Sequence, residues 1–313
     1  MHTLTGMLMA AAAACAFGPI AAQAQEAEVQ VVPGFADFLA VDGDTVWATN
    51  EGRVEQWSRK GKLAEVAVTL PCGGMSVDFG SLWVADCPAG TVKRIDIHTA
   101  KVIATIPSGI ANPEEGELNT VTGAGSVWIA SEAKGVIARI DPATNAVVAS
   151  IPVEPGSWYL AFGLGSLWAV SAKANVLQRI DPATNTVTRK VALGNAPGFL
   201  VAGEGAVWVQ EQGDGTVARI DPVSVTVTGR VKVGANLKWG DIDTGGGKVW
   251  LRTTDDQEFA VIDPQSLAIL ARVGKPAGSG ALRTTPDGVW TSAHDIHTLN
   301  WWPKGAEALA AKP

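Results

Sequence analysis

The chain has 313 residues, of which 47% are hydrophobic and 18% are charged, and its formal net charge is −7. This acidic balance disfavours nucleic acid and anionic membrane surfaces as partners, because both need clustered Lys and Arg to meet phosphate groups. Beyond the first 24 residues the sequence has no stretch long and apolar enough for a membrane-spanning helix, so we expect no membrane span.

Residues 1–24 have the features of a secretion signal peptide. The run from Leu8 to Ile20 is apolar and rich in Ala, and Ala22-Gln23-Ala24 is a small-x-small cleavage site. The segment before this run lacks Lys and Arg, and Cys15 offers a lipidated alternative in which the preceding residues are only alanines. We expect a periplasmic or secreted protein whose mature part is residues 25–313.

A repeat of about 40 residues organises this mature part. Each copy holds four short runs rich in β-branched residues, separated by turn residues, which is typical of strands. The second run carries a Trp, which recurs at intervals of 36 to 45 residues as Trp47, Trp83, Trp128, Trp168, Trp208, Trp250 and Trp290. Seven four-stranded copies predict an all-β fold, a seven-bladed β-propeller of antiparallel blades in one domain.

The turns and the two ends fit this ring. In Asp-Pro-Ala-Thr-Asn, at 141–145 and 181–185, Asp can bond the amides ahead of it and Asn tolerates a left-handed backbone. Residues 28–32 form a fourth run with no first three runs before it, whereas residues 305–313 after the last copy make a poor strand. We therefore expect residues 28–32 to join the last blade as its outer strand and close the ring.

With strands lettered A to D from the channel outwards, the D–A and B–C loops share one rim. The largest departure from the repeat lies there, in residues 108–119, and includes Glu114, Glu115 and Glu117. Varied loops on a fixed scaffold often carry function. We expect a monomer that binds a small molecule or a periplasmic protein at this rim.

Cys72 and Cys87 are the two cysteines of the mature part, and they lie symmetrically about the turn at residues 78–81. A hairpin would place them opposite each other, within reach of a disulfide, and an exported chain is oxidised. Two thiols binding a metal ion would lack companion ligands nearby. The sequence therefore predicts a Cys72–Cys87 disulfide.

Aligning the copies on their Trp yields two columns of interest. The third residue after Trp is Asn50, Asp86, Ser131, Ser171, Glu211, Thr253 or Ala293, and Glu211 is the candidate for catalysis in this column. The seventh residue before Trp is Ala40, Ser76, Val121, Ala161, Val201, Asp243 or Arg283. Asp243 and Arg283 break this small or apolar column on adjacent blades, so we expect them to form an ion pair near the channel, as a structural pair or with Arg283 facing an anionic ligand.

The B–C loops of blades 6 and 7 concentrate His and carboxylates. The candidate metal ligands are Asp255, Asp256, Glu258, His294 and His297. Such side chains can bind a divalent cation such as Mg²⁺ or Ca²⁺, or share acid–base catalysis, although the spacing follows no strict motif. The alternative is that they are solvated loop residues.

Four aromatic residues outside the Trp column stand near the starts of inner strands: Trp158, Tyr159, Phe199 and Trp239. Rings at a channel mouth can stack on a flat or sugar-like ligand, and they are the candidate ligand-binding residues. The alternative is that they plug the channel, because large apolar rings prefer burial.

Units such as VWIASEAKGVIARIDPATNAVVASIPV (127–153) and LWAVSAKANVLQRIDPATNTV (167–187) resemble the YVTN-repeat and virginiamycin B lyase-like propellers. The resemblance implies a seven-bladed propeller, and in the lyase Glu and His near the channel support metal-assisted elimination. Here Glu211 carries the repeat glutamate, Asp86 is a shorter counterpart, and Asp295-x-His297 is nearest to the histidine pattern.

Two functions are thus open. In the first, an exported propeller binds a ligand or protein through its loop-rich rim and channel. In the alternative, the resemblance implies a metal-assisted lyase or lactone hydrolase that uses Glu211, Asp243, Arg283, His294 and His297.

Overall fold

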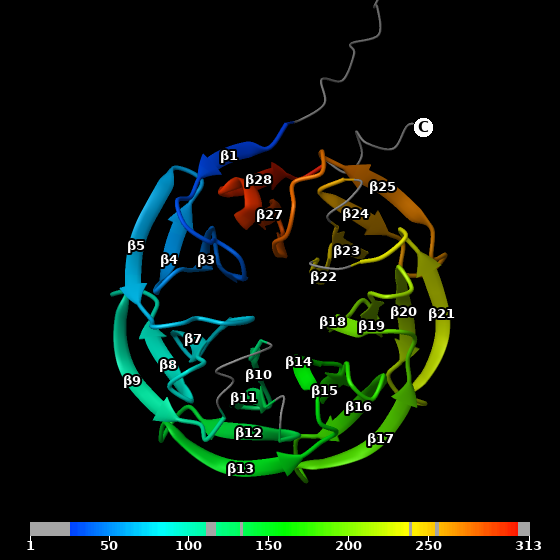
Figure 1. Ribbon diagram of the computed structural model, residues 1–313, viewed down its shortest axis with the longest axis horizontal. Coiled ribbons are helices and arrows are strands. Elements are labelled where there is room, and N and C mark those ends of the chain that lie inside the picture. The colour runs from blue at the N-terminus through cyan, green and yellow to red at the C-terminus, as the bar shows by residue number, and fades with distance from the viewer. Residues whose placement is uncertain (1–25, 111–116, 132–133, 238–239, 254–256, 306–313) are drawn as a thin grey trace, which may run out of the picture.

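The computed structural model describes residues 26–110, 117–131, 134–237, 240–253 and 257–305. These residues form seven four-stranded antiparallel sheets arranged as blades around a central channel (Figure 1). The predicted seven-bladed propeller is confirmed, with strand A of each blade nearest the channel and strand D at the periphery (Figure 1). The described part of the chain contains no helix that is both long and apolar enough to cross a membrane.

The first four blades follow one another along the chain. Blade 1 has β2 (Leu39–Asp42), β3 (Thr45–Asn50), β4 (Arg53–Ser58) and β5 (Gly61–Ala67). Blade 2 has β6 (Ser76–Asp78), β7 (Ser81–Asp86), β8 (Thr91–Asp96) and β9 (Lys101–Pro107). Blade 3 has β10 (Thr120–Gly123), β11 (Ser126–Ser131), β12 (Val136–Asp141) and β13 (Ala146–Pro152). Blade 4 has β14 (Ser157–Gly163), β15 (Ser166–Ser171), β16 (Val176–Asp181) and β17 (Thr186–Ala192).

The last three blades complete the ring. Blade 5 has β18 (Pro197–Gly203), β19 (Ala206–Glu211), β20 (Thr216–Asp221) and β21 (Thr226–Lys232). Blade 6 has β22 (Ile242–Gly245), β23 (Lys248–Arg252), β24 (Phe259–Ile262) and β25 (Ile269–Val273). Blade 7 has β26 (Leu282–Thr285), β27 (Gly288–Ala293), the short 3₁₀ helix η1 (His294–Ile296) and β28 (Thr298–Pro303), and its fourth strand is β1 (Glu28–Val31).

The ring is closed by β1, as expected from the sequence. This strand pairs antiparallel with β28, with Glu28 opposite Trp301 and Val31 opposite Thr298. The side chain of Gln30 also donates a 2.8 Å hydrogen bond to the carbonyl oxygen of Ser58 in blade 1. The N-terminal strand therefore covers an edge that β28 would otherwise leave open and links blade 7 to blade 1.

The Trp of each copy is buried between blades, and all seven are at most 6% exposed. In blades 2 to 6 the indole N–H donates to a carbonyl oxygen five residues earlier, at 2.9 to 3.1 Å. This bond satisfies the polar atom of an otherwise apolar side chain, which explains why Trp suits the position. In blades 2 to 5 an Arg of strand C lies over the indole, within 6.0 Å of the ring centroid.

The Asp-Pro-Ala-Thr-Asn turns also connect neighbouring blades. Asp141 accepts the Ala143 amide at 2.8 Å, and Asn145 has a left-handed backbone with φ of 52°, as the turn chemistry predicts. Arg94 of blade 2 then donates to the Asn145 side chain at 2.8 Å and to the carbonyl of Pro142 at 2.6 Å. The turn therefore stabilises the contact between blades as well as its own hairpin.

Candidate functional site

A cavity of about 740 Å³ opens at the rim formed by the D–A and B–C loops. All seven blades contribute to its walls, so it is the mouth of the central channel. Its lining comprises Phe35, Asp37, Phe38, Thr49, Asn50, Glu51, Leu70, Pro71, Cys72, Glu117, Tyr159, Phe199, Gln212, Gly240, Asp241, Ser279, Gly280, Ala281, His294 and Asp295.

The charge of this lining is one-sided. The described lining residues include no Lys or Arg. They include five carboxylates: Asp37, Glu51, Glu117, Asp241 and Asp295. Such a cluster in a concave site favours positively charged ligands when its carboxyl groups are ionised.

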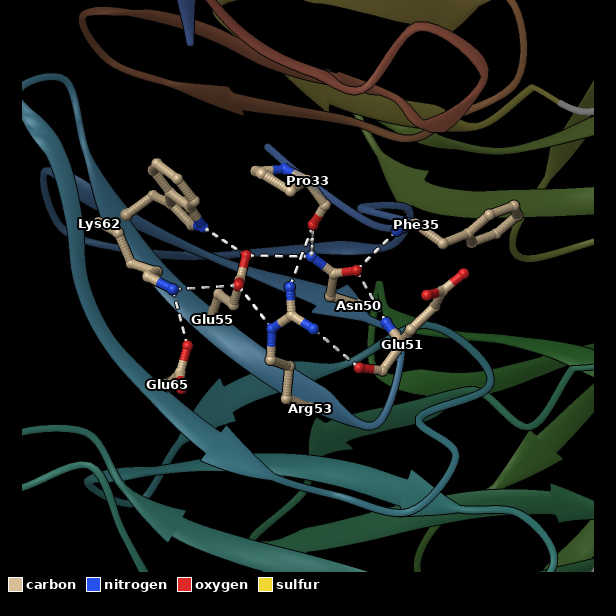
Figure 2. Close-up of polar contacts among 9 residues, drawn as sticks. Pro33, Phe35, Asn50, Glu51, Arg53, Glu55, Lys62 and Glu65 are labelled. Carbon is tan, nitrogen blue, oxygen red and sulfur yellow. Dashed lines mark hydrogen bonds and ion pairs between the residues drawn. The ribbon is translucent and has the colours of Figure 1, made fainter. Parts of the chain in front are cut away.

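Asp37 belongs to the loop before β2, and Asn50 anchors this loop (Figure 2). The Asn50 amide oxygen accepts the Phe35 N–H at 2.6 Å, and its NH₂ group donates to the carbonyl of Pro33 at 3.0 Å. The same NH₂ group donates to the Glu55 carboxylate at 3.2 Å, which fixes the amide orientation. One buried side chain at the end of β3 thus sets the course of the loop that carries Asp37.

The main chain of Asp37 is fixed as well. Its N–H donates to the carbonyl of Thr49 at 3.1 Å, and its carbonyl accepts a hydrogen bond from the Ser292 hydroxyl of blade 7. Burial, together with the nearby charges of Asp241 and Asp295, raises the pKa of the Asp37 carboxyl to about 7, although Arg252 opposes the shift. Asp37 therefore titrates near neutral pH.

Glu117 lines the same mouth from the loop just before β10 of blade 3. Its neighbour Leu118 donates its N–H to the carbonyl of Cys72 at 3.3 Å, so this loop is attached to the loop before β6. Burial, then the charges of Asp37 and Asp241, raises the pKa of Glu117 well above its ordinary value. Its Oε2 atom is buried and has no hydrogen-bond partner among the described residues.

The predicted Cys72–Cys87 disulfide is present, with the two Cα atoms 6.0 Å apart. β6 begins only at Ser76, so Cys72 lies in the loop before the strand. The register shifts in this loop, where Pro71 pairs with Asp86 and the Cys87 N–H donates to the carbonyl of Leu70. Cys87 is fully buried, whereas Cys72 lines the cavity. The bridge therefore tethers the loop on which the Glu117 segment rests.

Aromatic rings from opposite sides of the ring meet in the channel. The centroids of Phe38 in blade 1 and Phe199 in blade 5 are 6.2 Å apart, and those of Phe199 and Tyr159 are 4.5 Å apart. Trp158 packs beside Tyr159 at 6.2 Å but is outside the cavity lining. Of the predicted ligand-binding residues, Tyr159 and Phe199 thus face the cavity and also narrow the channel, while Trp239 lies outside the described residues.

The ion pair at blades 6 and 7 differs in one partner from the expected one. Arg283 pairs with Asp241, two residues before Asp243. Asp243 instead accepts hydrogen bonds from the Thr284 amide at 2.8 Å and the Thr284 hydroxyl at 2.9 Å. The direct pair expected between Asp243 and Arg283 is replaced by Asp241–Arg283, because the amide and hydroxyl of Thr284 hold the Asp243 carboxylate. The charges of Asp243 and Arg283 still act on each other without a direct salt bridge.

Glu211 is fully buried at the end of β19 and is outside the cavity lining. Its carboxylate accepts bonds from Arg230 at 2.8 and 3.0 Å, from the Thr216 hydroxyl at 2.6 Å and from the Gly194 amide at 2.6 Å. Burial raises the pKa of Glu211, but the bonds from Arg230, Thr216 and Gly194 outweigh burial and lower it overall. These contacts attach the D–A loop of blade 5 to the blade.

The predicted metal ligands do not converge where the structure describes them. Glu258 is buried and accepts bonds from Thr291, Asn300 and Trp302 of blade 7. The His297 ring bonds the carbonyl of Gly34 at 2.7 Å.

His294 stacks on Phe35, with a ring-centroid separation of 3.8 Å, and is the one predicted ligand that lines the cavity. Asp255 and Asp256 lie outside the described residues. Among the described His, Cys, Asp and Glu there is no group of three or more that could hold a metal ion, so the predicted metal site is tested only for Glu258, His294 and His297.

Sequence reasoning missed Asp37 and Asp241 as members of the site. For Asp241 a signal was available in the repeat, nine residues before each Trp, and Asp37 lies one residue before the same column. The column consists of Phe38, Gly74, Asn119, Tyr159, Phe199, Asp241 and Ala281. Five of these seven line the cavity. The column two positions later, which holds Asp243 and Arg283, lies opposite the Trp in the A–B hairpins instead.

Comparison with known proteins identifies the fold. No family model matches the chain, and no curated protein matches it by sequence. The structure of selenomethionine-substituted virginiamycin B lyase from Staphylococcus aureus is similar at a TM-score of 0.74 and 15% identity, covering 89% of this chain and 99% of that one.

A streptogramin B lyase structure gives a TM-score of 0.74 at 16% identity and covers 89% and 97% of the two chains. A chain of the mitotic checkpoint complex gives 0.73 at 16% identity and covers 97% and 98%. The resemblance to virginiamycin B lyase-like propellers is therefore confirmed at the level of the fold. The same fold occurs in lyases and in a mitotic checkpoint complex, so it does not by itself indicate a function.

Proposed function

We propose that this propeller is an exported binding protein that takes a small organic molecule in the mouth of its channel. The observation that carries the proposal is the cavity of about 740 Å³ to which all seven blades contribute. The contact between Phe38 and Phe199 narrows the channel there, and aromatic walls with a few convergent polar groups are the usual composition of a ligand site.

Export is supported by the Cys72–Cys87 disulfide, because disulfides persist in oxidising compartments. The proposed signal peptide, residues 1–24, lies outside the described residues. Intact-mass measurement of the protein from a periplasmic extract should give a chain that begins at Gln25 and is two hydrogen atoms lighter than the reduced form. A full-length reduced chain in the cytoplasmic fraction would contradict export.

Binding is tested by a thermal-shift screen of a small-molecule library against three proteins. The wild type is compared with Gln212→Trp, which places a large neutral side chain at the cavity wall, and with Val223→Trp, a control in a turn on the opposite rim. Val223 is 78% exposed, so its replacement leaves the cavity untouched.

A specific ligand stabilises the folded state in proportion to ln(1 + [L]/Kd), so compounds that bind in the mouth should raise the midpoint of the wild type and of Val223→Trp only. Hits that act equally on all three proteins, or a screen without hits, would refute binding in the mouth.

The described contacts give less support to the alternative, a metal-assisted lyase or lactone hydrolase. The residues expected to supply its metal ligands and acid–base groups are engaged elsewhere: Glu211 with Arg230, Asp243 with Thr284, and Glu258 with blade 7. No donor set in the described residues favours this function over binding.

A further inference from the structure

The negative charges of the cavity are only partly balanced by the protein. Asp241 pairs with Arg283. Arg252 is fully buried behind the wall and donates its hydrogen bonds to the main-chain oxygens of Thr253, Glu258, Gly278 and Ser292. Among the described residues, neither Asp37 nor Glu117 forms a salt bridge.

Glu117 is the more unusual of the two. Buried carboxylates are normally paired or fully hydrogen-bonded, because an uncompensated buried charge is costly. Its Oε2 atom is shielded from solvent and unpartnered, yet the side chain lines an open cavity. No described residue donates a hydrogen bond to this oxygen, so a bound ligand could supply the missing donor.

The surroundings of this acceptor are aromatic. Tyr159 and Phe199 line the same cavity as Glu117, and the charge of Glu117 adds to burial in raising the pKa of the Tyr159 hydroxyl. A carboxylate next to the faces of aromatic rings attracts cations by charge and by cation–π interaction at once.

We propose that the channel mouth binds an organic ammonium ion with an aryl body, whose N–H groups donate to Glu117 and Asp37 while the aryl group packs on Tyr159 and Phe199. The proposal rests on the proposed binding function and specifies its ligand class. An ammonium group has donors only and a carboxylate has acceptors only, so the two complement each other. A bare metal ion would need several converging ligands, which the described residues do not provide.

The test uses three probes of similar shape and different charge. They are 2-phenylethylammonium, its neutral counterpart 2-phenylethanol, and the anion phenylacetate, each titrated calorimetrically into the oxidised, mature protein at pH 7.5 and low salt. We expect the cation to bind about tenfold or more tightly than the alcohol, because it gains a charge-assisted bond in a desolvated site, and the anion to bind most weakly.

Variants identify the carboxylate responsible. Glu117→Gln keeps the shape and removes the charge, so it should weaken the cation about tenfold while leaving 2-phenylethanol unchanged. Asp37→Asn gives a second, independent removal of charge should Glu117→Gln fold poorly. Glu65→Gln, on the outer strand β5 with a side chain 57% exposed, is the control and should leave all three affinities unchanged.

The pH dependence provides a readout that a loss of structure would not mimic. Asp37 faces Asp241, Asp295 and Arg252, and Glu117 faces Asp37 and Asp241. The pKa of Asp37 is raised to about 7, and its ionised form binds the cation, so affinity for 2-phenylethylammonium should increase from pH 6 to pH 8.

Tighter binding of the alcohol or the anion than of the cation would overturn the charge assignment, while the proposed binding function would stand on its library hits. Absence of binding by 2-phenylethylammonium would also overturn the ammonium proposal, and the proposed binding function would again stand on its library hits. Retained cation binding in both Glu117→Gln and Asp37→Asn would also overturn it. A library screen without hits refutes the binding function itself, so the two failures are distinguishable.

Discussion

Replacing Glu211 by Gln tests whether this carboxylate stabilises blade 5 or performs chemistry. In the folded protein Glu211 accepts two bonds from Arg230, one from Thr216 and one from the Gly194 amide. Glutamine preserves the size of the side chain but replaces one oxygen by a donor NH₂ group. Both oxygens of Glu211 accept hydrogen bonds, so the NH₂ group of glutamine would face N–H or O–H donors. The variant therefore loses the ion pair with Arg230 and at least one further hydrogen bond.

The magnitude follows from burial. Removing one partner of a fully buried ion pair costs about 3–5 kcal/mol. Glu211 is fully buried, but the Arg230 side chain is 44% exposed, so water compensates part of the loss. We expect a loss of about 2–3 kcal/mol in the free energy of unfolding, because hydrogen bonds to charged groups contribute about 1.5–3 kcal/mol. The midpoint of thermal unfolding should fall by roughly 3–5 °C.

The assay is urea and thermal unfolding of wild type and Glu211→Gln between pH 7.5 and pH 3.5. The pKa of Glu211 is lowered in the folded protein, so its contribution is present above the ordinary carboxyl pKa of about 4.3 and is lost as pH falls through the folded value. The difference between the two proteins should therefore shrink in acid. Equal stability at pH 7.5, within about 0.5 kcal/mol, would refute the assigned role. Glu204→Gln, in an A–B turn on the opposite rim, is the control.

Three further predictions concern stability. Reducing the Cys72–Cys87 bridge, which has a sequence separation of 15, should lower the unfolding free energy by about 3 kcal/mol in urea titrations, and an unchanged midpoint would contradict this. Deleting residues 28–31 exposes the edge of β28, so size-exclusion chromatography should show self-association at micromolar concentration, whereas a stable monomer would argue against the closing role of β1. Asp37→Asn should raise the thermal midpoint more at pH 8 than at pH 5, because the raised pKa means that the ionised form destabilises the fold at high pH. An equal effect at both pH values would show that Asp37 is not perturbed.

The fold could be predicted because the spacing within the repeat reflects the pairing of strands A and B. Each Trp lies in strand B directly opposite the residue seven positions earlier, as with Val201 and Trp208 or Asp243 and Trp250. A two-residue turn and antiparallel pairing fix this offset, so aligning the copies on Trp also aligned the strands. Closure by the N-terminal strand followed from counting strands, since the last copy was one short.

The site was harder to predict because the chain leaves the repeat there. Phe38, Asp241 and Ala281 precede their strands, so no strand alternation indicated which way they face. Glu117 lies in the longest loop, where the copies cannot be aligned. The pairing of Cys72 with Cys87, by contrast, was predicted from the symmetry of a single hairpin, although Cys72 lies in the loop before the strand.

The column that includes Glu211 shows why polar residues in a repeat are a weak guide to catalysis. Asn50 accepts the Phe35 amide, Asp86 accepts the Leu70 amide at 3.3 Å, Ser171 donates to the Pro155 carbonyl, and Glu211 accepts the Gly194 amide. In each of these blades, one buried polar side chain at the end of strand B holds the preceding D–A loop.

This side chain bonds a main-chain N–H or C=O group of the loop that water would otherwise have to satisfy. The residue type at this position can therefore vary as long as the side chain offers a donor or an acceptor. It follows that the loop which carries Asp37 is held by Asn50 through main-chain groups, and these bonds do not depend on the side chains of the loop. The residue that anchors this loop and the residue that faces the channel are therefore different positions.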